Sequence, residues 1–147
     1  MAIKEQISRD LTDAMRARDK PKIDALRFVM AAIKQIEIDE RITIDDSRTL
    51  ILLNKLVKQH NESITQFALA GRDDLILHEK FSLDLIKLYL PEPLSNQAVE
   101  ALINAAIVSC DAKKISDMGK VMTELKPKLY GRCDLSQVSV LLKNKLS

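Results

Sequence analysis

The sequence predicts an all-α fold, and three observations carry the prediction. Apolar residues recur three and four positions apart along nearly the whole chain, which is the spacing of amphipathic helices. Only 3 of the 147 residues are glycine. Aromatic residues make up 3% of the chain and tryptophan is missing, which favours helices packed through leucine and isoleucine over a β-sandwich or a barrel.

The first two helices are expected to lie antiparallel at the start of the chain. The first runs from about Ile3 to Arg18. The second begins around Asp19 and Pro21, because proline is tolerated in a first turn, and it reaches about Ile38. Their inward faces consist of Ile3, Ile7, Leu11, Ala14, Met15, Ile23, Leu26, Met30, Ile33 and Ile36.

A third and a fourth helix follow an acidic break. Asp45 or Asp46 is placed to cap the third helix, and Gly71 is placed to end it. Asp73 or Asp74 then begins the fourth helix. The inward residues are Leu50, Leu53, Leu56, Val57, Ile64, Phe67 and Ala68 in the third helix, and Leu75, Phe81, Leu85, Leu88 and Tyr89 in the fourth.

The segment Leu90-Pro91-Glu92-Pro93 marks a domain boundary in the sequence. Proline cannot donate to the hydrogen-bond ladder of a helix, and it biases the preceding residue away from helical conformation. We therefore expect an N-terminal domain of about four helices over residues 1–91 and a small three-helix domain over residues 94–147. Ser95 is placed to cap the fifth helix.

A helix, a glycine turn and a last helix make up the rest of the small domain. Ser116 is placed to cap the sixth helix, and Gly131 to end it. Asp134 can cap the seventh, with Gln137 in the capping-box position. The inward faces of the last three helices comprise Val99, Leu102, Ile103, Ala106, Ile107, Met118, Val121, Met122, Leu125, Leu129, Val138, Leu141, Leu142 and Leu146.

Positive charge gathers in the small domain, although the whole chain carries only +2. Residues 1–93 contain 15 Lys and Arg against 16 Asp and Glu, whereas residues 94–147 contain 8 against 5. Lys120, Lys126, Lys128 and Arg132 are expected close to the Gly131 turn, where Lys126, Lys128 and Arg132 are placed to form a basic rim. A solvated surface, a contact with phosphates and a contact with a protein partner all fit this pattern.

Gly119 stands in the first turn of the predicted sixth helix. Glycine costs about 1 kcal/mol relative to alanine inside a helix, so the position calls for a reason. Close packing against another helix is one, and close approach of a ligand to the backbone is the other. Lys120 beside it makes an anionic partner worth considering, since a helix N-terminus favours negative side chains.

The sequence contains no constellation typical of catalysis, and we expect no metal and no cofactor. His60 and His78 lie on different helices and are interpreted as structural. Cys110 and Cys133 lack the spacing of a metal site and are expected to be reduced thiols. No apolar run of about 18 residues is present, and the early residues are too acidic for a transit peptide. These features favour a cytoplasmic protein without a membrane span.

Several separate blocks of the sequence match the pattern of a known family. The most distinctive block is Asp117-Met-Gly-Lys-Val-Met122, which is followed by Pro127-Lys128, Gly131-Arg132 and Asp134. Further blocks, in the same order, are Leu26-Arg27, residues 31–41, Lys58-Gln59, Ala70-Gly71-Arg72 and Tyr89-Leu90-Pro91. Together they resemble the GatB/YqeY family, and over the whole chain they are similar to its stand-alone YqeY-like members. Cys133, Ser139 and the pair His60-Asn61 depart from the family pattern, and the last departure weakens the third helix as a basic binding face.

The resemblance implies a fold, a partner and a set of contact residues. In this family the C-terminal unit is shared with the tail of the GatB component of the glutamine-dependent aspartyl/glutamyl-tRNA amidotransferase, a tRNA-contacting element. That tail holds neither the kinase nor the transamidation centre, although the family is grouped under carbon-nitrogen ligase activity with glutamine as amido donor. The candidate nucleic-acid-binding residues are Gly119, Lys120, Lys126, Lys128, Gly131 and Arg132.

Three functions follow as hypotheses. The first is a non-catalytic accessory protein that associates with tRNA. The second is an adaptor that docks on an amidotransferase or an aminoacyl-tRNA synthetase. The third is a contribution to amide transfer within an enzyme complex whose active site lies on another chain.

Overall fold

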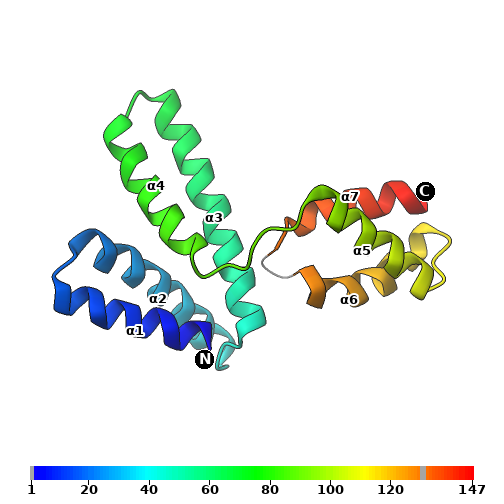
Figure 1. The fold of residues 1–147 in the computed structure, drawn as a ribbon, viewed down its shortest axis with the longest axis horizontal. Helices are drawn as coiled ribbons and strands as arrows, with labels where there is room; N and C mark the ends of the chain where they lie inside the picture. Colours follow the sequence, from blue (N-terminus) through cyan, green and yellow to red (C-terminus); the bar gives the residue numbers. More distant parts are fainter. Residues whose placement is uncertain (1, 130–131) are drawn as a thin grey trace. The chain divides into compact units, whose positions relative to one another are not determined.

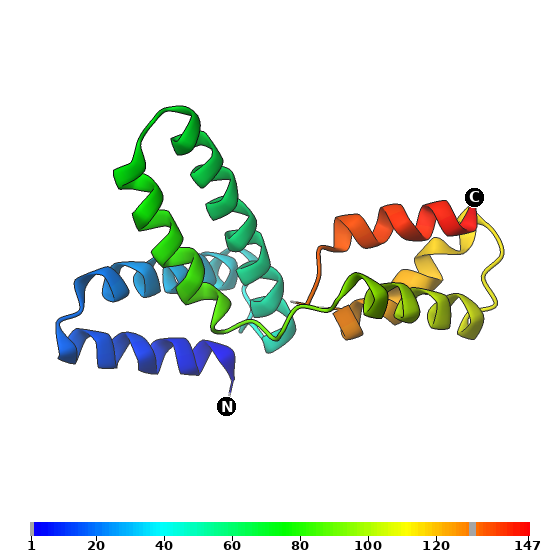
Figure 2. The same ribbon diagram turned by 45° about the horizontal axis from the view of Figure 1, so that its top comes forward.

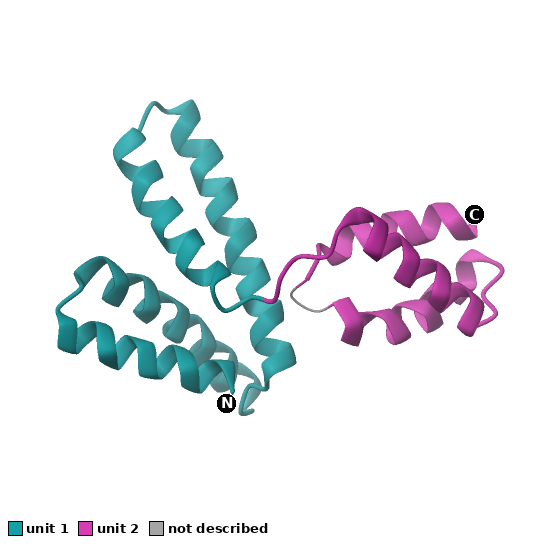
Figure 3. Cartoon of the chain, in the orientation of Figure 1, with its two compact units in different colours: residues 1–90 teal, residues 91–147 magenta. Residues whose placement is uncertain are grey.

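The computed structural model describes residues 2–129 and 132–147 of the chain. These residues form seven α-helices and one short 3₁₀-helix, and no strand is found among them, which confirms the all-α prediction (Figure 1). The chain divides into two compact units, residues 1–90 (unit 1) and residues 91–147 (unit 2) (Figure 3). None of the helices in the described stretches has both the length and the apolar character needed to cross a membrane.

Unit 1 consists of two helical hairpins. Helix α1 (Ile3–Ala17) packs antiparallel on α2 (Lys20–Glu40), and α3 (Asp46–Leu69) packs antiparallel on α4 (Asp73–Lys87) (Figures 1 and 2). The four helices expected in this part of the chain are confirmed.

The start of α3 joins the two hairpins. Asp45 caps this helix, because its Oδ1 accepts a hydrogen bond from the backbone N–H of Arg48 at 2.8 Å. Asp46, the alternative cap, instead accepts a hydrogen bond from the backbone N–H of Ile3 at 2.9 Å. Asp45 thus caps α3, and Asp46 links the first turn of α1 to the start of α3.

Gly71 makes the turn between α3 and α4. Its φ is +69°, in the left-handed region that glycine adopts without a Cβ penalty. The glycine end of α3 is therefore confirmed. Helix α4 begins at Asp73, and the carboxylate of Asp74 lies 3.1 Å from the guanidinium of Arg72.

The core of unit 1 draws on all four helices, and the structure corrects the inward face of α4. Phe81 and Leu88, expected in the core, are 41% and 78% exposed. Leu83 and Ile86 are buried instead, because α4 packs against both α3 and α2. Leu88 is exposed because it follows the last turn of α4. The buried cluster comprises Ile7, Ala14, Ala25, Leu26, Val29, Ile33, Ile44, Leu52, Leu53, Leu56, Leu85 and Ile86.

Unit 2 is a three-helix unit with a core of its own. It contains α5 (Asn96–Ser109), the 3₁₀-helix η1 (Ile115–Asp117), α6 (Met118–Leu129) and α7 (Leu135–Leu146). The inward faces of α5 and α6 are as expected, whereas Leu141 on α7 is 43% exposed. The buried residues are Val99, Ile103, Ala106, Ala112, Val121, Leu125, Leu129, Val138, Leu142 and Leu146.

Two of the three predicted caps in unit 2 are confirmed. Ser95 Oγ accepts a hydrogen bond from the backbone N–H of Ala98 at 3.1 Å, and Asp134 Oδ1 accepts one from Ser136 at 2.9 Å. Ser116 lies inside η1 and does not begin α6. A 3₁₀ turn occupies the position expected for the cap, because the Asp117 carboxylate accepts from the backbone N–H groups just before η1.

Candidate nucleic-acid interface

Helix α6 carries three of the four basic residues predicted to contact nucleic acid. Lys120, Lys126 and Lys128 are all exposed. Arg132 follows the helix and is half-buried. Gly131, which completes the predicted set, lies outside the described residues, as does Tyr130.

The helical repeat divides the three lysines between two sides of α6. Residues turn by about 100° each along an α-helix, so Lys120, Glu124 and Lys128 form one row. Lys126 points about 160° away from Lys128 by the same repeat. The two lysines of the row, Lys120 and Lys128, are separated by about 12 Å along the helix axis. Lys120 and Lys128 thus lie in one row along α6, with Lys126 on another side of the helix.

Arg132 is engaged with the segment that precedes α5. Its backbone carbonyl accepts a hydrogen bond from the N–H of Leu94 at 2.9 Å, and its Nε donates to the backbone carbonyl of Glu92 at 3.4 Å. Arg132 therefore links the segment between α6 and α7 to the segment that begins unit 2.

Glu124 places a negative charge between the two lysines of the row. The thiol of Cys110 donates a hydrogen bond to Glu124 Oε2 at 2.8 Å. This bond, then a side-chain hydrogen bond with Ser109, lowers the pKa of Glu124, and it raises the pKa of the Cys110 thiol. Glu124 is consequently ionised at neutral pH. The sequence spacing of 14 residues gives no sign of this pair.

Gly119 is exposed at the start of α6, and its surroundings test one of the two reasons offered for it, close packing. A Cβ built on Gly119 meets no atom within 4 Å. Close packing against another described helix is therefore excluded as the reason. The fold has room for alanine at this position, and the backbone beside Lys120 is left uncovered.

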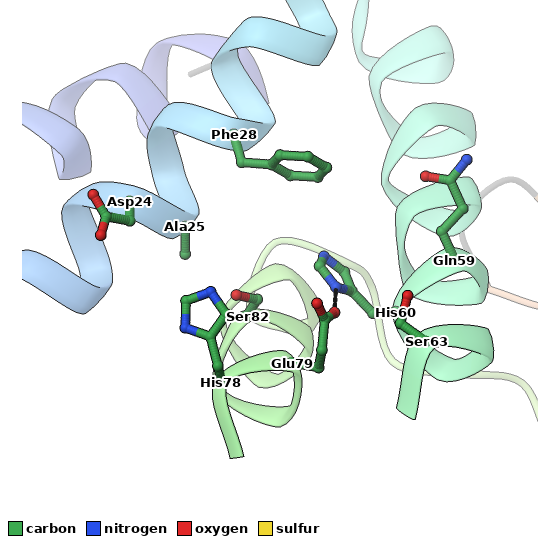
Figure 4. A pocket seen from close by; sticks show the side chains of 9 residues that line it. All are labelled: Asp24, Ala25, Phe28, Gln59, His60, Ser63, His78, Glu79 and Ser82. Carbon is green, nitrogen blue, oxygen red and sulfur yellow. Dashed lines mark hydrogen bonds and ion pairs between the residues drawn. The ribbon is translucent and has the colours of Figure 1, made fainter. Parts of the chain in front are cut away.

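A second candidate site lies in unit 1, where sequence reasoning placed none. A cavity of about 300 Å³ opens between α2, α3 and α4, and both histidines line it (Figure 4). His60 Nδ1 is hydrogen-bonded to Glu79 Oε2, while its Nε2 is buried with no hydrogen-bond partner among the described residues. The histidines are thus brought to one pocket although they lie on different helices. No periodic signal links residues on facing helices of a hairpin, so the sequence could not reveal this site.

Comparison with known proteins gives one family and a group of fungal relatives. The model of the family described as "Yqey-like protein" matches residues 4–146. "Altered inheritance of mitochondria protein 41, mitochondrial" of Saccharomyces cerevisiae (strain ATCC 204508 / S288c) is 33% identical over 123 residues, 79% of this chain and 66% of the relative. The protein of the same name from Pyrenophora tritici-repentis (strain Pt-1C-BFP) is 29% identical over 126 residues, 82% and 70% respectively. The chain thus spans about two thirds of the length of these curated relatives.

These relatives also correct the location expected from the sequence. The prediction of a cytoplasmic protein is wrong by this comparison, because the matched relatives are named as mitochondrial proteins. That prediction depended on the acidic residues near the start of the sequence, and these residues do not determine the subcellular location of a folded domain.

Proposed function

The chain belongs to the YqeY-like protein family, and on this premise we propose that it is a non-catalytic accessory protein that docks on tRNA through α6 of unit 2. In this proposal, Lys120 and Lys128 contact phosphates, and Gly119 allows the RNA backbone to come close. Arg132 adds a positive charge just after the C-terminal end of α6. The amide chemistry associated with the family would then belong to other chains.

The uncovered backbone at Gly119 is the observation that carries this proposal. An exposed glycine in a helix costs about 1 kcal/mol relative to alanine, and no packing contact offsets that cost here. A phosphate group could approach the first turn of α6 at Gly119 without meeting a Cβ. The attraction would come from side-chain charge, because η1 runs directly into α6 and the Met118 N–H already donates to the Ile115 carbonyl. Lys120, next in sequence, adds a charge at the same place.

The contacts expected from this surface are with phosphates and not with bases. The row along α6 offers lysine ammonium groups, which act as point charges on phosphate oxygens and carry no sequence information. Binding should therefore weaken as salt rises, by about one unit in the slope of log affinity against log salt for each phosphate contact, and tolerate many tRNA sequences. The ionised Glu124 lies between the two lysines and repels phosphate groups. It therefore weakens the attraction of α6 for RNA and keeps the two phosphate contacts separate, one at each lysine.

A titration of fluorescent tRNA with the whole protein at low and at moderate salt tests the proposal. We expect saturable binding at low salt that weakens as salt rises. No binding at low salt would refute the proposal.

A second candidate function is an adaptor that docks on an amidotransferase or an aminoacyl-tRNA synthetase. It is favoured by Val140 and Leu141, neighbouring residues of α7 that are 60% and 43% exposed. Both line a cavity of about 550 Å³ between α5 and α7, together with Asn96 and Gln137. Contiguous exposed apolar side chains are typical of protein interfaces. Recovery of a synthetase or of an amidotransferase component with the chain after nuclease treatment would favour this function over RNA docking.

A further inference from the structure

Helix α2 of unit 1 carries a row of basic side chains that the surface on α6 does not include. Lys20, Arg27 and Lys34 recur at intervals of seven residues, and all three are exposed. An α-helix turns by about 100° per residue, so each of these side chains points within about 20° of the one before and lies about 10.5 Å further along the axis. The three residues, called the α2 row below, therefore form one line of positive charge about 21 Å long.

Two carboxylates that adjoin the α2 row in the sequence are held by other groups. Glu37, three residues after Lys34, is paired with Lys4 of α1 at 2.8 Å. Asp19, directly before Lys20, caps α2 by accepting a hydrogen bond from a backbone N–H of its first turn at 3.4 Å. No member of the row forms an ion pair with a carboxylate of the described residues. The cations of the row are thus left facing solvent.

Asp24 is the exposed acid that lies closest to the row along α2. By the helical repeat it points about 40° away from Lys20 and about 60° away from Arg27. Its charge offsets part of the attraction at this end of the row. Three cations against this one free carboxylate still leave the row positive.

A hollow beside the α2 row offers further donors for an anion. This surface cavity of about 380 Å³ lies between α1 and α2. Met30, between Arg27 and Lys34 in the sequence, lines it from α2, and the residues from α1 are Lys4, Glu5, Ser8, Arg9 and Thr12. Arg27 extends toward the same helix, because its Nη2 lies 3.7 Å from Met15 Sδ on α1. Guanidinium, ammonium and hydroxyl groups are all donors to phosphate oxygens.

The burial of α2 favours a nucleic acid over a membrane surface as the partner. Basic helices that bind membranes insert a continuous apolar side into the lipid. In α2 that side, with Leu26, Val29 and Ile33, is buried in the core of unit 1. Evenly spaced cations on a rigid helix instead suit a polyanion whose charges repeat along its length, as the phosphates of a nucleic acid do.

We propose that the α2 row is a second RNA-binding surface of this protein, which contacts the phosphate backbone through Lys20, Arg27 and Lys34. The guanidinium of Arg27 binds one phosphate through two N–H groups, and the two lysines act as point charges on its neighbours. The choice of RNA as the polyanion rests on the proposed function. The surface itself is independent of α6, because it belongs entirely to unit 1.

A titration of fluorescent tRNA with the whole protein over a series of salt concentrations tests the α2 row. Lys20, Arg27 and Lys34 are replaced together by Gln, which removes three charges from exposed positions. We expect weaker binding and a slope of log affinity against log salt reduced by about 3. An unchanged slope would overturn the proposal.

The matched control removes the same charge from other exposed positions of unit 1. Lys55→Gln and Lys58→Gln lie on α3, and Lys80→Gln lies on α4. This variant should keep the slope of the wild type. An equal reduction in the control and in the α2 variant would show a response to net charge alone and would overturn the proposal. Equal melting temperatures of the two variants are expected, because all six positions are exposed.

The same titration separates the α2 row from the surface on α6. If the α2 variant has a reduced slope while joint replacement of Lys120 and Lys128 by Ala leaves it unchanged, the α2 row is supported and docking through α6 is wrong. The reverse result would overturn the α2 row alone. Absence of tRNA binding by the wild type at low salt would overturn both.

Vesicles made of equal parts of phosphatidylcholine and phosphatidylserine test the membrane alternative. In a sedimentation assay we expect the α2 variant and the control variant to bind these vesicles equally. If the α2 variant alone loses vesicle binding and keeps the tRNA affinity of the wild type, the α2 row is a lipid-binding surface and the proposal is wrong.

Discussion

Lys4 and Glu37 form an ion pair that fastens α1 to α2, with Lys4 Nζ 2.8 Å from Glu37 Oε1. The other oxygen of this carboxylate accepts a hydrogen bond from the backbone N–H of Ile44 at 3.0 Å. One side chain therefore joins α1, α2 and the loop that leads into α3. Lys4, then the Ile44 N–H, holds the pKa of Glu37 below its ordinary value of 4.5.

This lowered pKa predicts a pH-dependent loss of stability. A carboxyl group whose folded pKa is lower than its unfolded pKa stabilises the folded state fully above the unfolded value, and loses that effect as the pH falls through the folded value. The difference in unfolding free energy between the wild type and Glu37→Gln should thus be largest at neutral pH and shrink below pH 4.5. Urea denaturation over a pH series measures it. Glu5→Gln, an exposed change on α1, is the control, and an equal effect of both variants would contradict the assigned role.

Gly119→Ala should stabilise the protein and weaken its binding to tRNA. The added Cβ meets no atom within 4 Å, and alanine in place of glycine in a helix is worth about 1 kcal/mol. Thermal denaturation and a tRNA titration measure the two effects. If the variant is more stable but has the same affinity for tRNA as the wild type, Gly119 does not belong to the interface.

Gly71→Ala should have the opposite effect on stability, and it provides the comparison for Gly119. A Cβ at Gly71 also meets no atom within 4 Å, but its φ is +69°. The left-handed conformation costs about 1–2 kcal/mol for other residues, so this variant should be destabilised although the space around it is equally free. Unchanged tRNA affinity of folded Gly71→Ala is expected. Equal stability changes in Gly71→Ala and Gly119→Ala would contradict the claim that the left-handed φ of Gly71 requires glycine.

Glu124→Gln should make Cys110 more reactive. The hydrogen bond to Glu124 is the main cause of the raised pKa of this thiol, ahead of desolvation and the charge of Glu124. Without the carboxylate, the pKa of Cys110 moves toward its ordinary value, and thiolate forms at a lower pH. Alkylation by iodoacetamide at mildly alkaline pH, followed by mass spectrometry, should therefore be faster at Cys110 in the variant. Cys133 serves as the internal control, because its pKa is raised by its own burial and by Asp134. Equal acceleration at both cysteines would point to a general loosening of unit 2.

The sequence was sufficient for the helices and most of their ends, because those depend on local rules. Asp45, Ser95 and Asp134 were found as caps from their side chains and positions. The choice between Asp45 and Asp46 needed the structure, since Asp46 is committed to Ile3, far away in the sequence. Leu88 shows the limit of periodicity, because helical spacing does not tell where a helix stops contacting its neighbours.

The candidate sites depended on contacts between helices, for which sequence patterns are less informative. Lys120 and Lys128 are exposed, and their spacing of four residues to either side of Glu124 predicts the row along α6, but the hydrogen bond between Glu124 and Cys110 is seen only in the structure. The space around Gly119, which the sequence does not show, excludes close helix packing as the reason for this glycine. The His60–Glu79 pair joins residues 19 positions apart across a hairpin, and no spacing rule connects them.

The salt dependence of tRNA binding tests the central claim most directly. Lys120 and Lys128 are replaced together by alanine, and a control variant removes the same charge from α4 through Lys80→Ala and Lys87→Ala, two exposed positions. Each phosphate contact contributes about one unit to the slope of log affinity against log salt, so the first variant should bind more weakly, with a slope reduced by about 2. The control should keep the wild-type slope. An unchanged slope for the α6 variant, or the same reduction in both, would contradict docking through Lys120 and Lys128.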